Sequence, residues 1–256
     1  MQHQDKPVVL VTGGGSGIGA AACHRFARDG ASIVLCGIDE APLEAIAREL
    51  QASGAEAISV CMDVTEVTAR QKLFETISQR FGRLDVLVNN AALIGQAAMA
   101  PAETQSLEHF ERIVSVNLTA AFAMAQLAFP FLRQSGGSIV NVSSVGGSAA
   151  QFHAAAYCAS KAGIDALTRS LALEWAASGV RVNALAPGDI QTKTTDALKT
   201  GWKTGETPKS SFARTTPLGR PGTAEEMADV IAFLASPAAS FITGEVLRAD
   251  GGFLTY

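Results

Sequence analysis

The sequence of 256 residues has few charged and few aromatic side chains. Only 17% of its residues are charged and 6% are aromatic, whereas 48% are hydrophobic. This composition excludes an intrinsically disordered chain, because disorder requires low hydrophobicity together with high net charge. Because large rings are scarce and the chain has 24 glycines, we expect an interior of small and β-branched residues that pack closely.

Concentrated positive charge is also missing. The chain has a formal net charge of −4 and no run of five basic residues. Nucleic-acid binding requires a basic surface, so we expect no nucleic-acid partner. Residues 1–7 are polar, and the most apolar segment, 118–132, is too short to span a bilayer. We therefore expect a soluble, cytoplasmic protein without a membrane partner.

The cysteines lack the spacing of a metal site or of a disulfide framework. None of the four forms a CxxC or CxxH pattern, which zinc sites commonly use. We expect reduced thiols and no metal site. The cysteines are Cys23, Cys36, Cys61 and Cys158.

Seven short apolar segments alternate with helical patterns. They show no alternation of apolar and polar residues, which is typical of strands buried on both faces of a parallel sheet. The pattern predicts a single α/β domain over 1–256, a doubly wound, mostly parallel, Rossmann-like sheet with helices on both faces. The predicted strands are 8–12, 32–36, 57–61, 86–89, 138–143, 181–186 and 245–249. Predicted helices include 17–29, 41–53, 65–81, 155–177 and 223–235.

One long irregular segment, 188–222, interrupts this alternation. Loops of this length in compact domains are usually functional lids or disordered segments. Trp202 and Phe212 favour a substrate lid, because solvated linkers seldom carry large apolar rings.

A glycine-rich turn, TGGGSGIG at 12–19, directly follows the first predicted strand and opens a helix. Glycines permit a tight turn and let the backbone approach a pyrophosphate, while the helix N-terminus supplies amide donors. A plain connection between strand and helix remains an alternative. The position after the first strand of a doubly wound sheet favours dinucleotide binding.

Tyr157 and Lys161 form a YxxxK pattern on a predicted helix, where positions four apart share a face. A tyrosine has an unperturbed pKa of about 10, and a nearby cation lowers that pKa because it favours the phenolate. The spacing therefore predicts a hydroxyl that exchanges protons with a substrate. A surface tyrosine beside a solvated lysine is the alternative reading.

Polar residues follow two other predicted strands. Ser144 ends the run NVSS at 141–144, and Asn90 lies within NNAA at 89–92. Ligands of open α/β sheets bind outside the carboxyl ends of the strands, so the Ser144 hydroxyl is placed to bind a substrate carbonyl. A helix cap for Ser144 and a polar strand end for the asparagines remain alternatives.

In their joint order and spacing, these motifs resemble the short-chain dehydrogenase/reductase family, in its single-domain branch. The resemblance runs from Val8 to about Gly252. It is carried by the glycine pattern at 12–19, Asp63-Val64, NNAA at 89–92, Asn117, the second serine of NVSS, the YxxxK pair and Pro187-Gly188.

The resemblance implies four catalytic residues. Tyr157 would be the general acid in carbonyl reduction and the base in alcohol oxidation. Lys161 would lower the pKa of Tyr157 and bind the nicotinamide ribose. Ser144 would hold the substrate carbonyl oxygen, and Asn117 would hold a water that links Lys161 to solvent.

The resemblance also implies a dinucleotide site. Asp63 would accept from the adenine amino group beside the Val64 amide, and Asn90 and Ala91 would line the ribose and nicotinamide. Segment 188–192 would clamp the carboxamide and the diphosphate. The expected cofactor-binding residues are Gly13, Ser16, Gly17, Ile18, Gly19, Asp39, Asp63, Val64, Asn90, Ala91, Tyr157, Lys161, Pro187, Gly188, Ile190 and Thr192.

The choice of cofactor is read after the second strand, where an acidic residue binds the ribose 2′-hydroxyl and an arginine accommodates a 2′-phosphate. Gly37 and Ile38 occupy these positions, and Ser16 in the glycine turn is not basic. Asp39 is close enough in sequence to reach the ribose and would repel a phosphate, although it is also a candidate helix cap. We therefore predict NAD, with NADP as the alternative.

The substrate is expected to be a small alcohol or ketone held by the loop after the fourth strand, by the residues before Tyr157 and by the lid. Glutamine and histidine side chains in these stretches favour a polar substrate, although His153 is equally explained as a residue at a helix start. The candidate substrate residues are Ile94, Gln96, Gln151, His153 and Trp202.

Helical patterns that are apolar over more than one face, within 118–132 and 155–177, predict further burial. In the resembled family such helices pack across a dimer and the last strand pairs into a tetramer, which implies a homotetramer. The complete catalytic set favours an NAD(P)-dependent enzyme acting on secondary alcohols and ketones. A catalytically silent dinucleotide sensor, and a lyase or epimerase on the same scaffold, remain alternatives.

Overall fold

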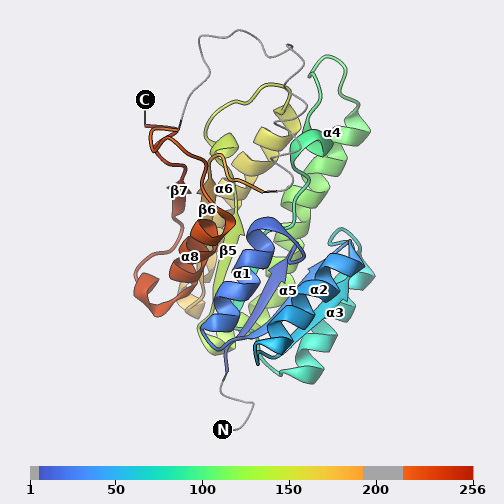
Figure 1. Ribbon diagram of the computed structural model, residues 1–256, viewed down its shortest axis with the longest axis vertical. Helices are drawn as coiled ribbons and strands as arrows, with labels where there is room; N and C mark the ends of the chain where they lie inside the picture. Colours follow the sequence, from blue (N-terminus) through green and yellow to red (C-terminus); the bar gives the residue numbers. More distant parts are fainter. Residues whose placement is uncertain (1–5, 193–215, 256) are drawn as a thin grey trace.

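The structure is a computed structural model that describes residues 6–192 and 216–255. In this part of the chain, seven strands form one sheet with the order β3-β2-β1-β4-β5-β6-β7 (Figure 1). Every strand is parallel to its neighbours, which confirms the predicted doubly wound fold. The strands are β1 (Val8–Thr12), β2 (Ser32–Gly37), β3 (Ala57–Cys61), β4 (Val86–Asn89), β5 (Ser138–Val142), β6 (Arg181–Pro187) and β7 (Val246–Ala249).

Burial on both faces explains why the central strands are apolar throughout. All five residues of β1 are buried, and so are all five of β5. In the register, Val11 of β1 lies between Leu35 of β2 and Val88 of β4. The edge strand β7 is only half-buried, because it has a neighbour on one side alone.

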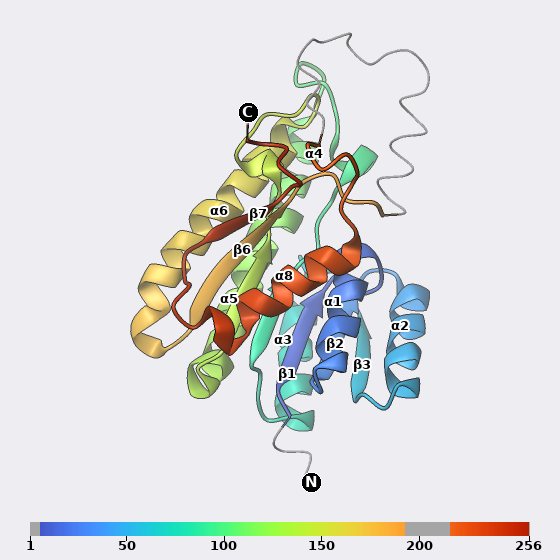
Figure 2. The same ribbon diagram turned by 60° about the vertical axis from the view of Figure 1, so that its left-hand side comes forward.

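Helices cover both faces of the sheet. On one face, α1 and α8 lie side by side with α2 (Figure 2), and they contribute Phe26, Met227 and Leu43 to one core cluster. On the other face, α3, α5 and α6 contribute Leu73, Met124 and Leu171 to a second cluster. The helices are α1 (Gly17–Arg28), α2 (Glu40–Ala52), α3 (Val67–Arg80), α4 (Leu107–Val114), α5 (Ala120–Ser135), α6 (Ala155–Trp175) and α8 (Ala224–Ala235).

A continuous helical run, Leu107–Ser135, joins α4 and α5 through a π-helical turn at Ser115–Thr119. With 29 residues, it has the length and apolar composition that could cross a bilayer, so the expectation that this region is too short was wrong. The underestimate arose because the apolar segment was counted without the amphipathic turns of α4. Within the fold, Met124 and Leu132 of α5 pack in the core against the sheet.

Local signals explain where the helices begin. Helix α8 starts after Thr223, whose hydroxyl accepts from the backbone N–H of Glu226 while the Glu226 carboxylate accepts from the N–H of Thr223. This reciprocal capping satisfies two N–H groups that the helix itself leaves unpaired. Helix α3 starts two residues later than expected, at Val67, because Asp63 accepts from both the N–H and the hydroxyl of Thr65 and forms a turn there.

The strand order reverses direction between β1 and β4, which are adjacent in the sheet but far apart in the chain. Such a switch point leaves a crevice outside the carboxyl ends of the strands. The glycine-rich turn after β1 and the NNAA segment after β4 therefore come together at one edge of the sheet.

Candidate active site

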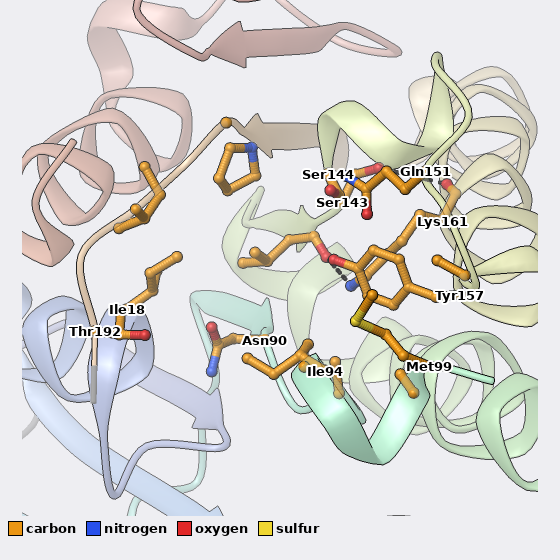
Figure 3. Close-up of a pocket in the computed structure, with 18 residues that line it drawn as sticks. Ile18, Asn90, Ile94, Met99, Ser143, Ser144, Gln151, Tyr157, Lys161 and Thr192 are labelled. Atoms are coloured by element: carbon orange, nitrogen blue, oxygen red, sulfur yellow. Dashed lines mark hydrogen bonds between the residues drawn. The ribbon is translucent and has the colours of Figure 1, made fainter. Parts of the chain in front are cut away.

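A pocket with a volume of about 230 Å³ lies at this edge. It is lined by residues from the start of α1, the segment after β4, the end of β5, helix α6 and the segment after β6. Figure 3 shows Ser144, Tyr157 and Lys161 on one side of the pocket, with Ile18 and Thr192 on the opposite side.

The glycine-rich turn has a backbone that other residues would not reproduce. Gly13 and Gly17 have φ values of +66° and +51°, which belong to the left-handed region. A side chain at Gly19 would collide with the carbonyl oxygen of Gly13. At Gly17, the nearest atom to an added Cβ is the Thr192 methyl group, at 3.5 Å, so the turn and the segment after β6 approach each other closely.

The first turn of α1 opens toward this side of the pocket. The first N–H groups of a helix have no partner within the helix, and the exposed Ser16 at the cap position makes no side-chain hydrogen bond to them. Uncapped amides and the positive end of the helix dipole favour an anion. The turn and α1 therefore fit a dinucleotide diphosphate, with Ile18 among the lining residues.

Thr12 and Asn90 fasten the glycine turn to the end of β4. The Thr12 hydroxyl accepts from the backbone N–H groups of Asn90 and Ala91, both at 2.9 Å. The Asn90 side chain donates to the carbonyl oxygens of Thr12 at 2.9 Å and Gly13 at 3.1 Å. Asn90 also lines the pocket, so it supports the turn and faces the ligand space at once.

The segment after β6 closes the same side. Pro187 ends the strand, and an added Cβ at Gly188 would lie 2.7 Å from the Cα of Asp250, so only glycine fits there. Ile190 is buried and, like Thr192, lines the pocket. The rest of the predicted lid up to residue 215, including Trp202, lies outside the described residues.

Two residues mark the outer end of the predicted dinucleotide site. Asp63 accepts from Thr65 and, at 2.7 Å, from the Arg112 guanidinium. Burial alone would raise the pKa of the Asp63 carboxyl, but the hydrogen bonds from Arg112 and Thr65 outweigh burial and lower it. The next residue, Val64, is buried.

Asp39 and Ile38 shape the corner between β2 and α2. Asp39 occupies the cap position of α2, yet its side chain makes no capping hydrogen bond and is exposed. Ile38 is 67% exposed, and Gly37 before it has no side chain. Asp39 is thus available to a ligand instead of being used by its helix.

The opposite side of the pocket carries the candidate catalytic side chains. Tyr157 and Lys161 lie one turn apart on α6, and the Lys161 Nζ is 5.7 Å from the centre of the Tyr157 ring. The Lys161 side chain is buried, and its Nζ donates to the Val142 carbonyl oxygen at 2.8 Å. Ser144, also buried, accepts from the Gly146 N–H at 3.0 Å and so begins the turn Val145–Gly147.

Burial controls the ionisation of both α6 residues. It lowers the pKa of the Lys161 ammonium to about 8, against the opposing effect of Asp165. It raises the pKa of the Tyr157 hydroxyl, which the Ser144 hydroxyl partly offsets. That Lys161 lowers the pKa of Tyr157 stays a prediction: in this structure the Lys161 Nζ donates to the Val142 carbonyl, and burial raises the pKa of the Tyr157 hydroxyl.

Asn117 lies in the π-helical turn behind this group and is 2% exposed. Its amide nitrogen donates to the Leu93 carbonyl and to the Ser160 hydroxyl, and its oxygen accepts from the Leu93 N–H. Asn117 therefore links the segment after β4 to helix α6, next to Lys161. Its expected role in holding a water stays a prediction.

The candidate substrate residues separate into two groups. Ile94 and Gln151 line the pocket, whereas Gln96 and His153 are exposed and are not among its lining residues. His153 has φ +55°, and its carbonyl accepts from the Ala100 N–H at 2.7 Å, so its backbone joins the two loops that flank the pocket. The pocket wall also includes three apolar side chains that no sequence motif indicated, those of Ala98, Met99 and Ala154.

The architecture and the pocket define a class of protein: a single-domain oxidoreductase that binds a nicotinamide dinucleotide. A model of the short-chain dehydrogenase/reductase family, described as enoyl-(acyl carrier protein) reductase, matches residues 13–254. The chain belongs to the short-chain dehydrogenase/reductase family.

Individual relatives agree with this assignment. A tropinone reductase homolog of Arabidopsis thaliana is 40% identical over 95% of this chain and 88% of its own. A 3-oxoacyl-[acyl-carrier-protein] reductase of Thermotoga maritima is 38% identical over 96% and 97%. The crystal structure of an actinorhodin polyketide ketoreductase variant with NADPH has a TM-score of 0.91 at 32% identity and covers 100% of both chains. The protein is therefore an NAD(P)-dependent enzyme that transfers hydride between the dinucleotide and an alcohol or ketone.

Proposed function

We propose that Tyr157 exchanges the proton in this reaction, with Ser144 and Lys161 in supporting roles. The observation that carries the proposal is the convergence of these three side chains, from the segment after β5 and from α6, on one side of the pocket (Figure 3). The bound dinucleotide supplies the hydride for carbonyl reduction or accepts it in alcohol oxidation. In reduction, the Tyr157 hydroxyl gives its proton to the carbonyl oxygen while Ser144 donates a hydrogen bond to the same oxygen.

The ionisation of Tyr157 supports this assignment for the reducing direction. A tyrosine whose pKa is raised keeps its proton at neutral pH, so it is a donor in the resting protein. Lys161 supplies a positive charge that stabilises the phenolate left after the transfer. In oxidation the roles reverse, and the phenolate removes the proton from the alcohol.

The experiment that tests this assignment is Tyr157→Phe, which removes one oxygen and keeps the ring. We expect the variant to fold as the parent does and to lose turnover by about 100-fold or more, because general acid–base catalysis supplies rate factors of this size. Turnover is measured by the absorbance of the reduced dinucleotide. Retention of more than a tenth of the parent turnover would refute the role of Tyr157.

For the cofactor, the proposal is NAD rather than NADP. Gly37, Ile38 and Asp39 provide no cation for a 2′-phosphate, and the exposed Asp39 carboxylate would repel one. The same carboxylate is able to accept from a ribose 2′-hydroxyl. Comparison of kcat/KM for the two cofactors tests this, and a tenfold preference for NADPH over NADH would overturn it.

For the substrate, we propose an uncharged ketone or secondary alcohol with an apolar body. Ile94, Met99 and Ala154 present apolar surface around Tyr157, while Gln151 offers one amide. Apart from Lys161, no charged side chain lines the pocket within the described residues. This proposal differs from the more polar substrate expected from Gln96, Gln151 and His153, of which only Gln151 lines the pocket. Matched ketones with and without a carboxylate test it, and faster turnover of the charged members would contradict it.

The remaining proposals concern assembly and location. Exposed apolar side chains lie on α5, α6 and the segment before β7, with Leu173 82% exposed and Phe241 fully so. They support a homotetramer, and light scattering after size exclusion tests this, with a monomer at micromolar concentration as the contrary result. A cytoplasmic location and a lid over 188–222 are likewise proposed.

A further inference from the structure

Asp165 is a buried carboxylate that the proton transfer does not use. It lies on α6 four residues after Lys161 and eight after Tyr157, so the three side chains follow one face of the helix. Only 5% of Asp165 is exposed. A carboxylate is seldom buried in this way without partners, so the groups around it indicate what it does.

Its first partner is the residue before Ser144. The Ser143 hydroxyl donates to the Asp165 Oδ1 at 2.5 Å and also approaches the Lys161 carbonyl oxygen at 3.4 Å. The backbone N–H of Ser143 donates to the Leu185 carbonyl of β6 at 2.7 Å. Ser143 is thus fixed on one side by the sheet and on the other by the Asp165 carboxylate.

The second contact lies on the far side of Ser144. An added Cβ at Gly147 would lie 2.7 Å from the Asp165 Oδ2 and 3.1 Å from the Lys161 carbonyl oxygen. The turn Val145–Gly147 is therefore pressed against α6 at Asp165, closely enough that only glycine fits. Ser144 begins this turn, so Asp165 contacts the chain both before and after Ser144.

The third relationship is electrostatic. Burial raises the pKa of the Asp165 carboxyl, while the Ser143 hydrogen bond and the charges of Arg169 and Lys161 oppose that rise. Asp165 in turn favours the charged form of Lys161, which lies four residues before it on the same face of α6. The other groups that contact the Asp165 carboxylate are neutral: Ser143 and Gly147, both from the segment after β5. Nothing else among these neighbours offsets the cost of burying the Lys161 charge, apart from the Val142 carbonyl.

We propose that Asp165 is a positioning residue with two separable effects: it anchors the Ser144 turn to α6 through Ser143, and it preserves the positive charge of Lys161. This proposal rests on the roles proposed above for Tyr157, Ser144 and Lys161. The two effects are separable because the first needs only a hydrogen-bond acceptor, whereas the second needs a negative charge.

Two variants separate the effects. Asp165→Asn keeps an oxygen that accepts from Ser143 but removes the charge. We expect its turnover in ketone reduction to match the parent at low pH and to decline about 1 pH unit earlier on the alkaline side, which is about a fivefold loss at pH 8. Asp165→Glu should restore the parental profile. Ser143→Ala keeps the charge but removes the anchor, so kcat should fall at every pH while the midpoint of the decline stays in place.

Glu174→Gln is the matched control, since it neutralises an exposed carboxylate on the same helix away from the pocket. It should leave both kcat and the pH profile unchanged. Thermal unfolding of each variant verifies that it is folded before kinetics are compared. If Asp165→Asn does not fold, Ser143→Ala still tests the anchor.

Some outcomes would overturn the proposal. If kcat declined at the same alkaline pH in Asp165→Asn and in the parent, the proposed charge effect would be refuted. If Ser143→Ala kept the parental kcat, the proposed anchoring effect would be refuted. A different outcome, high turnover in Tyr157→Phe, would refute the proposed proton donor without bearing on these contacts, so the two failures are distinguishable.

Discussion

The two sides of the pocket are built by different means. On the side of the glycine turn, the proposed binding role rests on the backbone: Gly13 and Gly17 adopt left-handed conformations, and the Ser16 side chain does not cap the start of α1. On the side of α6, buried side chains carry it, above all Ser144 and Lys161. The first side should therefore be sensitive to added volume, and the second to lost charge or lost hydroxyl groups.

The largest expected effect is on the α6 side. Lys161→Met keeps most of the length of the side chain and removes its charge, so the phenolate of Tyr157 loses its stabilising cation. We expect kcat to fall by about 100-fold or more. The dissociation constant of the dinucleotide should rise by less than about tenfold, which corresponds to one lost hydrogen bond. Stopped-flow turnover and a fluorescence titration measure the two quantities.

Lys72→Met, an exposed lysine on α3, is the control and should change neither quantity. If Lys161→Met instead raised the dissociation constant of the dinucleotide far more than tenfold while kcat at saturating dinucleotide stayed parental, the α6 side would be a binding side. The contrast between the two sides would then be lost.

The next effect is on the glycine side. In Gly19→Ala, the new methyl group would meet the Gly13 carbonyl and lie 2.6 Å from the Asn90 amide nitrogen, so the turn must move. We expect dinucleotide affinity to fall by more than tenfold and the free energy of unfolding to fall by about 1–3 kcal/mol, as overpacking does elsewhere. Gly15→Ala in the same turn is the control, because its nearest atoms lie at 3.3 Å. Equal affinities for the two variants would contradict the account.

A smaller effect is expected where the turn is fastened to β4. Thr12→Val removes the hydroxyl that accepts from the N–H groups of Asn90 and Ala91. Leaving such donors unsatisfied costs about 1–3 kcal/mol in the free energy of unfolding. Thr12→Ser keeps the hydroxyl and should retain most of the stability in a urea titration. A Thr12→Val variant as stable as the parent would show that these hydrogen bonds do not hold the turn.

The smallest effect comes from pH. Lys161 carries its charge below its pKa of about 8 and loses it above that pH. Since the charge stabilises the phenolate of Tyr157, kcat for ketone reduction should fall to about half near pH 8 and continue to fall as the pH rises. A kcat that increases from pH 7 to pH 9 would contradict the assigned role of Lys161.

The sequence predicted the sheet well because each strand is apolar along its whole length. The predicted bounds of all seven strands agree with the structure to within one residue at each end. The helix predicted from residue 223 begins one residue later, because Thr223 is the cap residue that precedes α8. The sequence also predicted correctly that the glycine-rich turn lies between β1 and α1 and that Tyr157 and Lys161 lie one turn apart on a helix, because both arrangements are local. Their roles in binding and catalysis remain the predictions tested above.

Features that depend on contacts between distant segments were not predicted. Gln96 and His153 were expected in the pocket, but the left-handed backbone of His153 and its hydrogen bond to Ala100 direct the loop differently. The raised pKa of Tyr157 follows from burial, which spacing on a helix does not reveal. The sequence shows that Asp165 lies four residues after Lys161, but it does not show that the fold places the Ser143 hydroxyl, from the segment after β5, against the Asp165 carboxylate.

We propose that dinucleotide binding and proton transfer belong to different sides of one pocket. The most direct test is the dissociation constant of Tyr157→Phe for the reduced dinucleotide, measured by fluorescence titration on the same preparation whose turnover is assayed. We expect a dissociation constant within about threefold of the parent, because one lost hydrogen bond costs little, together with turnover below a hundredth of the parent value. Loss of binding in parallel with turnover would contradict it.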